Sequence, residues 1–311
     1  MAETILESIG NTPLVELRNI VPPGSARMVV KLEWANPTGS MKDRMARAVI
    51  EAAAEDGRLP EGGTVVDYTG GTTGISLAFI CAAKGYRFHA VFSDAFSDEK
   101  RAVMEAYGAT VTVLPSGDRR ITADLIRSMI ETARRLSRQP GHWWADQIGN
   151  HDAVTGYYPL GEEIWNQTGG RIDAFVQTVG SAHSLHGVTR SLWKHNAKIH
   201  IAAGEPAESA VLSGGPPGAH QIEGIGIGFI PALWDPGMVN EIIPVPTSEA
   251  MAMARRLARE EGLLAGTSSG ANVIAALRIA ERLGPGATVA TLLVDSGLRY
   301  ISTPLFARSA G

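Results

Sequence analysis

Short runs rich in β-branched residues alternate with helix-like segments along most of this 311-residue chain. The runs cover residues 28–34, 64–68, 88–92, 110–114, 172–179, 198–202 and 288–294. Strands that are separated in sequence by helices usually pair in parallel and are covered by those helices. The alternation therefore predicts an α/β protein whose sheets are mostly parallel and flanked by helices.

The length of the chain allows two lobes of ordinary size. An amphipathic stretch at residues 123–136 is followed by a segment at 139–147 that contains Pro140 and Gly141. We place the boundary there and predict an N-terminal lobe of residues 1–147 and a C-terminal lobe of residues 148–311. Early strands can cross to the other lobe in such a chain.

Helix ends are marked by capping residues and glycines. Ser40 and Asp43 have the spacing of a capping box, so a helix is expected to open at Ser40. Ser97 precedes a charged helical segment. Gly57 and Gly85 stand where two further helices should end.

Charge and hydropathy exclude several classes of function. The 28 Lys and Arg against 32 Asp and Glu give a formal charge of −4 without a basic block, which argues against nucleic acid as a partner. The first eight residues show neither a basic nor an apolar targeting segment, and no run of about eighteen apolar residues could span a bilayer. We expect a cytoplasmic protein without a membrane partner.

The chain has a single cysteine, Cys81, which lies in an apolar segment and is expected to be a small buried side chain. One cysteine cannot form a disulfide within the chain or a cysteine-built zinc site. The eight histidines show no HExxH or comparable spacing, so no metal site is predicted.

Lys42 follows an expected strand and falls in the first turn of the helix predicted after it. A cation there meets the positive end of the helix dipole, which disfavours the ammonium form by a few tenths to about 1 kcal/mol. A lysine shifted toward the neutral amine suits Schiff-base chemistry. Taken alone, the segment is equally consistent with a solvated surface lysine.

Several strand-to-helix junctions are rich in Gly, Ser and Thr. Residues 67–74 offer glycines and threonine hydroxyls at a helix N-terminus, where a carboxylate or phosphate would bind, although glycines there can also serve turn geometry alone. Residues 176–184 offer further phosphate donors but match neither a Walker loop nor GxGxxG. Residues 223–231 and 266–271 add two similar segments. In open α/β sheets such junctions form the binding crevice.

Taken together, these segments resemble the cysteine synthase (O-acetylserine sulfhydrylase) and cystathionine β-synthase family of fold-type II enzymes that depend on pyridoxal 5′-phosphate (PLP). The resemblance runs in the same order through residues 9–15, 36–44, 69–74, 205–209, 220–231, 264–271 and 295–303. It implies a two-lobed fold similar to that of the tryptophan synthase β subunit, each lobe being a mostly parallel sheet flanked by helices. It also implies a homodimer.

The resemblance assigns roles residue by residue. Lys42 matches the catalytic lysine that carries the cofactor as a Schiff base and moves the substrate α-proton. Ser268 matches the partner of the pyridine nitrogen, and a neutral hydroxyl there favours loss of a β-substituent over transamination. The other cofactor-binding matches are Thr72 and the phosphate-binding segment Gly180, Ser181, Ala182, His183 and Ser184. The matches to substrate-binding residues are Thr69, Gly70, Gly71, Thr72, Thr73, Gln147 and Gly224.

The chain departs from the family pattern at two of these segments. The family loop Thr-Ser-Gly-Asn-Thr-Gly has Gly70 in place of its serine and Thr72 in place of its asparagine. The family phosphate segment Gly-Thr-Gly-Gly-Thr carries Ala182 and His183 at its second and third glycine positions. His183 can serve as an additional phosphate donor or as a packed side chain.

The resemblance implies a β-replacing transferase of amino-acid biosynthesis. It would act on an O-activated serine-type amino acid through an α-aminoacrylate, with a small nucleophile as second substrate and atypical donors or nucleophiles allowed. Two alternatives stay open: a β-eliminating lyase or deaminase with the same cofactor, and a PLP-binding protein of low turnover that acts through a partner. The leaving group, the nucleophile and the pathway are not specified by the sequence.

Overall fold

The computed structural model describes residues 3–117 and 121–306. The chain forms two compact units: unit 1 comprises Met1–Ile9 and Lys42–Gly156, and unit 2 comprises Gly10–Met41 and Tyr157–Gly311. The division after Gly156, and the assignment of Gly10–Met41 to unit 2, differ from a single boundary after Gln147. The early segment belongs to unit 2 because its strand β2 (Arg27–Leu32) pairs with β10 (Thr288–Leu293).

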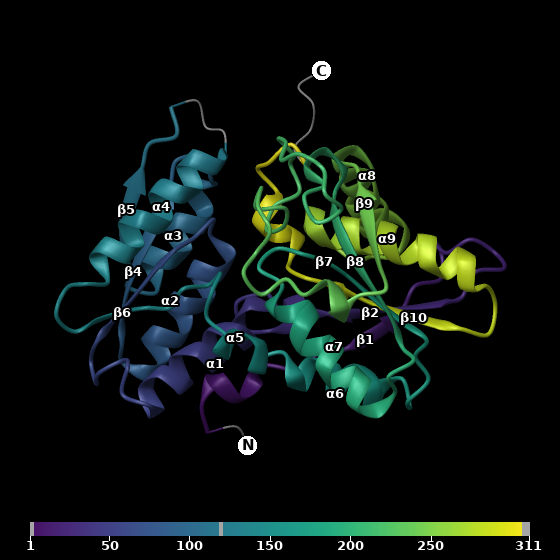
Figure 1. The fold of residues 1–311 in the computed structure, drawn as a ribbon, viewed down its shortest axis with the longest axis horizontal. Coiled ribbons are helices and arrows are strands. Elements are labelled where there is room, and N and C mark those ends of the chain that lie inside the picture. Colours follow the sequence, from purple (N-terminus) through teal and green to yellow (C-terminus); the bar gives the residue numbers. More distant parts are fainter. Residues whose placement is uncertain (1–2, 118–120, 307–311) are drawn as a thin grey trace. The chain divides into compact units, whose positions relative to one another are not determined.

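Unit 1 is built on a four-stranded parallel sheet with the strand order β5-β4-β3-β6. Figure 1 shows the helices of this unit around the sheet. The strands are β3 (Thr64–Tyr68), β4 (Arg87–Ser93), β5 (Thr110–Leu114) and β6 (His142–Trp144). The helices are η1 (Ile5–Ser8), α1 (Lys42–Glu55), α2 (Thr72–Lys84), α3 (Asp98–Ala106), α4 (Ala123–Leu136) and α5 (Asp152–Thr155). Val66 and Val91 of the sheet pack with Leu125 and Met129 of α4 into one apolar cluster.

Unit 2 is built on a six-stranded sheet with the order β1-β2-β10-β7-β8-β9, in which only β1 is antiparallel to its neighbour. Its other strands are β1 (Leu14–Glu16), β7 (Ala174–Thr178), β8 (His200–Pro206) and β9 (Glu241–Val245). Its helices are α6 (Tyr158–Gln167), α7 (His183–His195), α8 (Thr247–Glu260) and α9 (Thr267–Leu283), with short 3₁₀ turns η2 (Glu33–Ala35), η3 (Ala207–Ser209), η4 (Pro236–Met238) and η5 (Gly297–Tyr300). Helix α9 is buried along most of its length against the sheet.

The predicted α/β class with mostly parallel sheets is confirmed, and all seven predicted strands are present within a few residues of their expected ends. The strands β1, β6 and β9 were not predicted. The first two are only three residues long, and β9 contains Pro244, which is typical of an edge strand rather than an obvious strand signal.

Most predicted helix ends are confirmed. Helix α3 begins directly after Ser97, and Gly85 ends α2 in the left-handed region at φ +77°. The expected start of a helix at Ser40 is wrong, since α1 begins at Lys42. Ser40 instead forms an antiparallel bridge with Asp295, because the backbone there pairs with the segment that leaves β10.

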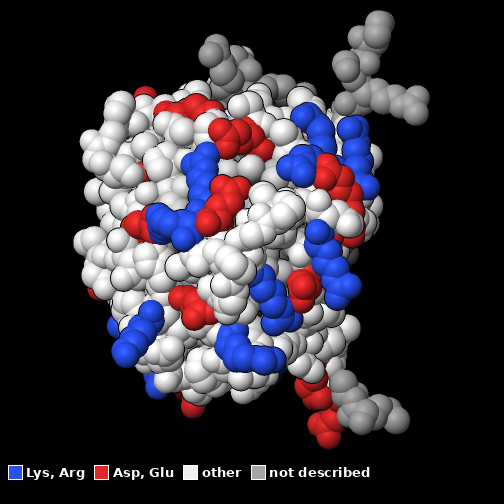
Figure 2. Space-filling model, turned by 90° about the vertical axis from the view of Figure 1, so that its right-hand side faces the viewer, with Lys and Arg blue, Asp and Glu red and all other residues white. Residues whose placement is uncertain are grey.

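Cys81 is 1 % exposed, as expected for a small core side chain, and burial raises the pKa of its thiol. On the face drawn in Figure 2, basic and acidic side chains are interspersed rather than gathered by sign. None of the helices in the described part of the chain is long and apolar enough to span a bilayer.

Candidate active site

Lys42 is the first residue of α1 and is partly buried. The backbone before it is held in unit 2, where Met41 N–H donates to the Val294 carbonyl at 3.0 Å. The N–H of Val294 in turn donates to Ser269 Oγ at 2.9 Å. Hydrogen bonds on both sides of Val294 therefore fix the point from which the chain enters α1 at Lys42.

The glycine-rich loop of unit 1 joins β3 to α2. Thr69 Oγ1 accepts hydrogen bonds from the N–H groups of Gly71 and Gly74, each at 2.9 Å. The amides of Thr72 and Thr73 fall in the first turn of α2, where N–H groups have no partner within the helix. Such a turn binds an anion such as a carboxylate.

The two central glycines of this loop are required by close packing. Gly71 has a φ of +120°, and a Cβ built on it would lie 2.3 Å from Lys100 Cδ. A Cβ on Gly70 would lie 3.0 Å from the ring of Phe96. The position of the serine side chain in the family pattern is thus closely bordered by Phe96, which gives a physical reason for the departure at Gly70.

Gln147 lies beside this loop because β6 pairs with β3 and the chain turns sharply at Asp146, a non-glycine residue with φ +49°. The side-chain amide of Gln147 donates to the Tyr68 carbonyl. An amide nitrogen carries two hydrogens, so one N–H of Gln147 is left to donate to a ligand. The sequence-based grouping of Gln147 with residues 69–73 agrees with this arrangement within unit 1.

Asp67 also contacts Gln147 beside the glycine-rich loop, and the sequence analysis did not single it out. Its carboxylate accepts hydrogen bonds from Tyr68 N, Trp144 Nε1 and Gln147 N at 2.9, 3.2 and 3.1 Å. Complete burial raises the pKa of Asp67, and the nearby Asp146 adds to the rise, whereas the three N–H donors act in the opposite direction. A lone acidic residue inside an otherwise apolar strand was the available signal.

The phosphate-type loop of unit 2 joins β7 to α7. A Cβ on Gly180 would lie 2.5 Å from the carbonyl oxygen of Gly224, so these two predicted site residues are in close contact. Ala182 adopts φ +71° and α7 begins at His183. A glycine approached by backbone, followed by a left-handed residue and a helix N-terminus, forms an anion-binding turn that fits a phosphate group.

The side chains of this loop are partly engaged with one another. Ser181 Oγ and His183 Nδ1 lie 2.7 Å apart, and the side-chain amide of Gln177 donates to Ser184 Oγ. The imidazole of His183 is buried, with the residue 1 % exposed. His183 therefore lies packed within the loop and orients the hydroxyl of Ser181.

Ser268 lies in the first turn of α9 and is 3 % exposed. The hydroxyls on either side of it serve the backbone: Thr267 Oγ1 accepts from Glu223 N at 3.1 Å, and Ser269 Oγ accepts from Val294 N. Within the described residues the Ser268 hydroxyl has no hydrogen-bond partner, which leaves it for a ligand atom such as a ring nitrogen.

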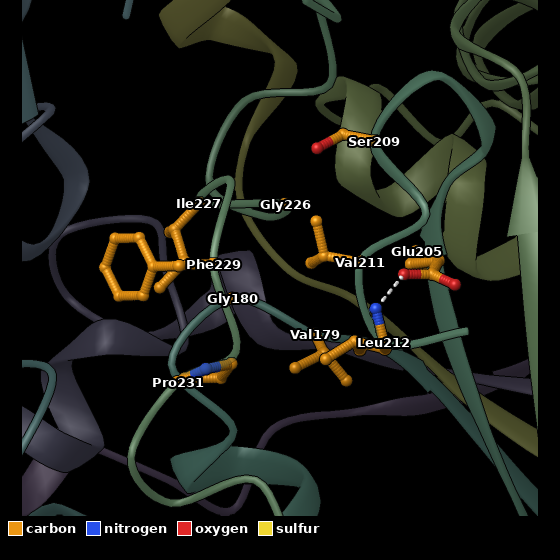
Figure 3. A pocket seen from close by; sticks show the side chains of 10 residues that line it. All are labelled: Val179, Gly180, Glu205, Ser209, Val211, Leu212, Gly226, Ile227, Phe229 and Pro231. Carbon is orange, nitrogen blue, oxygen red and sulfur yellow. Dashed lines mark hydrogen bonds between the residues drawn. The ribbon is translucent and has the colours of Figure 1, made fainter. Parts of the chain in front are cut away.

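A small pocket of unit 2 adjoins the phosphate-type loop. Figure 3 shows it between the segment that carries Glu205 and Ser209 and the segment that carries Ile227 and Phe229, with Gly180 at its edge. The carboxylate of Glu205 closes one side by accepting from Leu212 N at 2.8 Å. Within residues 3–117 and 121–306, no cluster of three or more His, Cys, Asp or Glu side chains could hold a metal ion.

Comparison with known proteins gives consistent matches. The model of the family described as pyridoxal-phosphate dependent enzyme matches residues 5–295. A cysteine synthase of Staphylococcus aureus is 42 % identical over 311 residues, which cover 98 % of this chain and 97 % of that protein.

Solved structures show the same likeness. A cysteine synthase from Entamoeba histolytica matches with a TM-score of 0.91 and 36 % identity, covering 100 % of this chain and 93 % of that one. An O-ureido-L-serine synthase matches with a TM-score of 0.91 and 36 % identity, covering 100 % of this chain and 97 % of that one. The chain belongs to the family of pyridoxal-phosphate dependent enzymes, within its cysteine synthase group.

Proposed function

We propose that this protein catalyses β-replacement on an O-activated L-serine, with PLP as cofactor and sulfide as nucleophile. The observation that carries the proposal is the 42 % identity to a cysteine synthase over 98 % of the chain, in a structure whose Lys42 opens a helix. The glycine-rich loop beside Gln147 and the phosphate-type loop beside Gly224 support it.

The residues that would hold the cofactor are assigned from the family resemblance, and the geometry of the loops supports the assignment. Lys42 would carry it covalently, the turn from Gly180 to Ser184 would hold its phosphate, and Ser268 would donate to or accept from its ring nitrogen. The hydroxyl of Thr72 would lie toward the cofactor ring. When bound, PLP supplies the electron sink that allows the α-proton and the β-substituent of an amino acid to leave.

The chain's own residues would perform the remaining work. The first-turn amides of Thr72 and Thr73, the hydroxyl of Thr69 and the side-chain amide of Gln147 would bind the substrate carboxylate. Gly70, Gly71 and Gly224 would border the substrate through their backbone atoms. Lys42 Nζ would take the α-proton and return it after the nucleophile has added at Cβ.

The fold is equally similar to that of a cysteine synthase and that of an O-ureido-L-serine synthase, since both have a TM-score of 0.91 against this chain. The nucleophile is therefore tested by experiment. In the test, the PLP-loaded enzyme receives O-acetyl-L-serine alone, O-acetyl-L-serine with sulfide, or O-acetyl-L-serine with hydroxyurea. We expect the cofactor spectrum to change on adding O-acetyl-L-serine and L-cysteine to form with sulfide. Formation of O-ureido-L-serine alone would reassign the nucleophile. Pyruvate release without a second substrate would identify the β-eliminating alternative.

The absence of any spectral change with several β-substituted amino acids would contradict catalysis and favour the PLP-binding protein of low turnover. The predicted homodimer and cytoplasmic location stay predictions. Sedimentation equilibrium of the purified chain tests the first, and fractionation of source cells tests the second.

A further inference from the structure

The side-chain carboxylate of Asp67 makes hydrogen bonds that are not part of the backbone pairing of β3 with its neighbouring strands. Asp67 is 0 % exposed and is the penultimate residue of β3, two positions before the loop that begins at Thr69. A buried carboxylate is costly unless hydrogen bonds compensate for the lost solvation. Both oxygens of Asp67 accept N–H donors, and these hydrogen bonds favour the ionised carboxylate against the effect of burial, which raises its pKa.

The two oxygens serve different parts of unit 1. Oδ1 accepts from Tyr68 N and from the indole N–H of Trp144, which are β3 and β6 contacts. Oδ2 accepts from Gln147 N at 3.1 Å. The Gln147 side chain then reaches the Tyr68 carbonyl, so Asp67 and Tyr68 hold the same glutamine by its backbone and its side chain.

The local backbone supports this contact. Ala145 N donates to the Val66 carbonyl at 3.0 Å. At the next residue, Asp146, the chain turns away from the sheet. Gly149 N and Asn150 N donate to the Asp146 carbonyl at 3.1 and 2.9 Å, which closes the turn. The turn directs the N–H of Gln147 at the carboxylate of Asp67.

We propose that Asp67 is a positioning residue for substrate binding: its Oδ2 anchors Gln147 beside the glycine-rich loop, so that the glutamine amide can donate to the carboxylate of the amino-acid substrate. The inference rests on the proposed function only in taking an amino acid as the ligand of this loop. It makes no use of the leaving group or the nucleophile.

The substitution Asp67→Asn keeps one of the two acceptor oxygens and replaces the other with a donor group. An asparagine has one acceptor oxygen and one NH₂ donor. Two donors face Oδ1 and one faces Oδ2, so the asparagine oxygen takes the Oδ1 position and its NH₂ group opposes Gln147 N–H. The substitution therefore releases Gln147 while it keeps the contacts of Tyr68 and Trp144. The matched control Trp144→Phe removes one donor on the other oxygen and leaves the Gln147 contact in place.

The experiment measures the dissociation constant of L-alanine, which has no leaving group, from the absorption of the bound cofactor in the PLP-loaded enzyme. We expect Asp67→Asn to weaken L-alanine binding by about tenfold or more, and Trp144→Phe by less than about threefold, since an anchoring hydrogen bond to a charged group is lost only in the first variant. With the reactive donor, KM should rise while kcat changes little. PLP affinity should stay as in the wild type, whereas the thermal midpoint of Asp67→Asn should fall, because the Gln147 N–H loses its acceptor.

The double variant Asp67→Asn, Gln147→Ala gives a second readout. If Asp67 acts through Gln147, the double variant binds L-alanine no more weakly than Gln147→Ala alone. Fully multiplicative losses, or an Asp67→Asn variant within threefold of the wild type, would overturn the inference. A wild-type enzyme that binds L-alanine but converts no O-acetyl-L-serine would refute the proposed reaction. The L-alanine titration of the variants would still decide the role of Asp67.

Discussion

The backbone N–H of Met41 donates to the carbonyl of Val294 at 3.0 Å, one residue before Lys42. Val294 follows β10, and its own N–H donates to Ser269, the neighbour of Ser268. The backbone that leads to the candidate Schiff-base lysine and the helix that carries the candidate ring-nitrogen partner are therefore both hydrogen-bonded to one residue of unit 2, Val294.

Replacing Lys42 should abolish the covalent link to the cofactor. The wild-type protein is expected to be yellow and to be bleached by borohydride with permanent attachment of the cofactor. Lys42→Ala should show no attachment, and its turnover should fall on the order of 10²–10⁴-fold because the proton-transferring amine is lost. Mass spectrometry after borohydride treatment checks the attachment site. Attachment to Lys31 or Lys100 instead would contradict the assignment.

Ser268 and Ser269 should behave differently although they are adjacent. Ser269→Ala leaves the Val294 N–H without its acceptor, so the free energy of unfolding should fall by about 1–3 kcal/mol. Ser268→Ala removes no hydrogen bond found within the described residues and should change stability little, while the absorption of bound PLP shifts. Denaturant titration of both variants, with spectra of the loaded enzymes, separates the two roles. Equal effects of both substitutions on the spectrum would contradict the role of Ser268.

Lys31 is a buried cation whose pairing should matter for stability. It is 0 % exposed, and its Nζ lies 2.7 Å from Glu163 and 2.8 Å from the side-chain oxygen of Gln167. Glu163→Ala should lower the free energy of unfolding by about 3 kcal/mol because it removes the carboxylate that lies 2.7 Å from the buried ammonium group of Lys31. The double variant Lys31→Met, Glu163→Leu should lose less, since no charge stays buried. A double variant that is less stable than Glu163→Ala would contradict this account.

Glu162 should contribute to stability in a pH-dependent way. The hydrogen bond from Ser191, followed by that from His195, lowers the pKa of Glu162 below its ordinary value of 4.5. A depressed carboxyl pKa gives stability that is present above the unfolded pKa and is lost as the pH falls through the folded one. The thermal midpoint of Glu162→Gln should therefore be below that of the wild type at neutral pH, with the gap closing under acid conditions. Glu55→Gln, an exposed control, should show no such gap.

The strands, their parallel arrangement and the position of Lys42 at a helix start could be predicted from the sequence, because hydrophobic periodicity and helix-start signals act over a few residues. The two glycine-containing loops before α2 and α7 could be located for the same reason. Their glycines mark backbone conformations that other residues resist, such as φ +120° at Gly71.

Other features were decided only by contacts between distant segments. The pairing of β2 with β10 assigns Gly10–Met41 to unit 2, and three residues are enough to make β6 a strand only because β3 lies beside it. The contact of Asp67 with Gln147 spans 80 positions in the sequence. Burial and hydrogen-bond geometry between residues so far apart in the sequence depend on how the whole sheet folds. The sequence therefore determined which segments carry the candidate site residues, and the tertiary structure decided which side chains hold those segments in place.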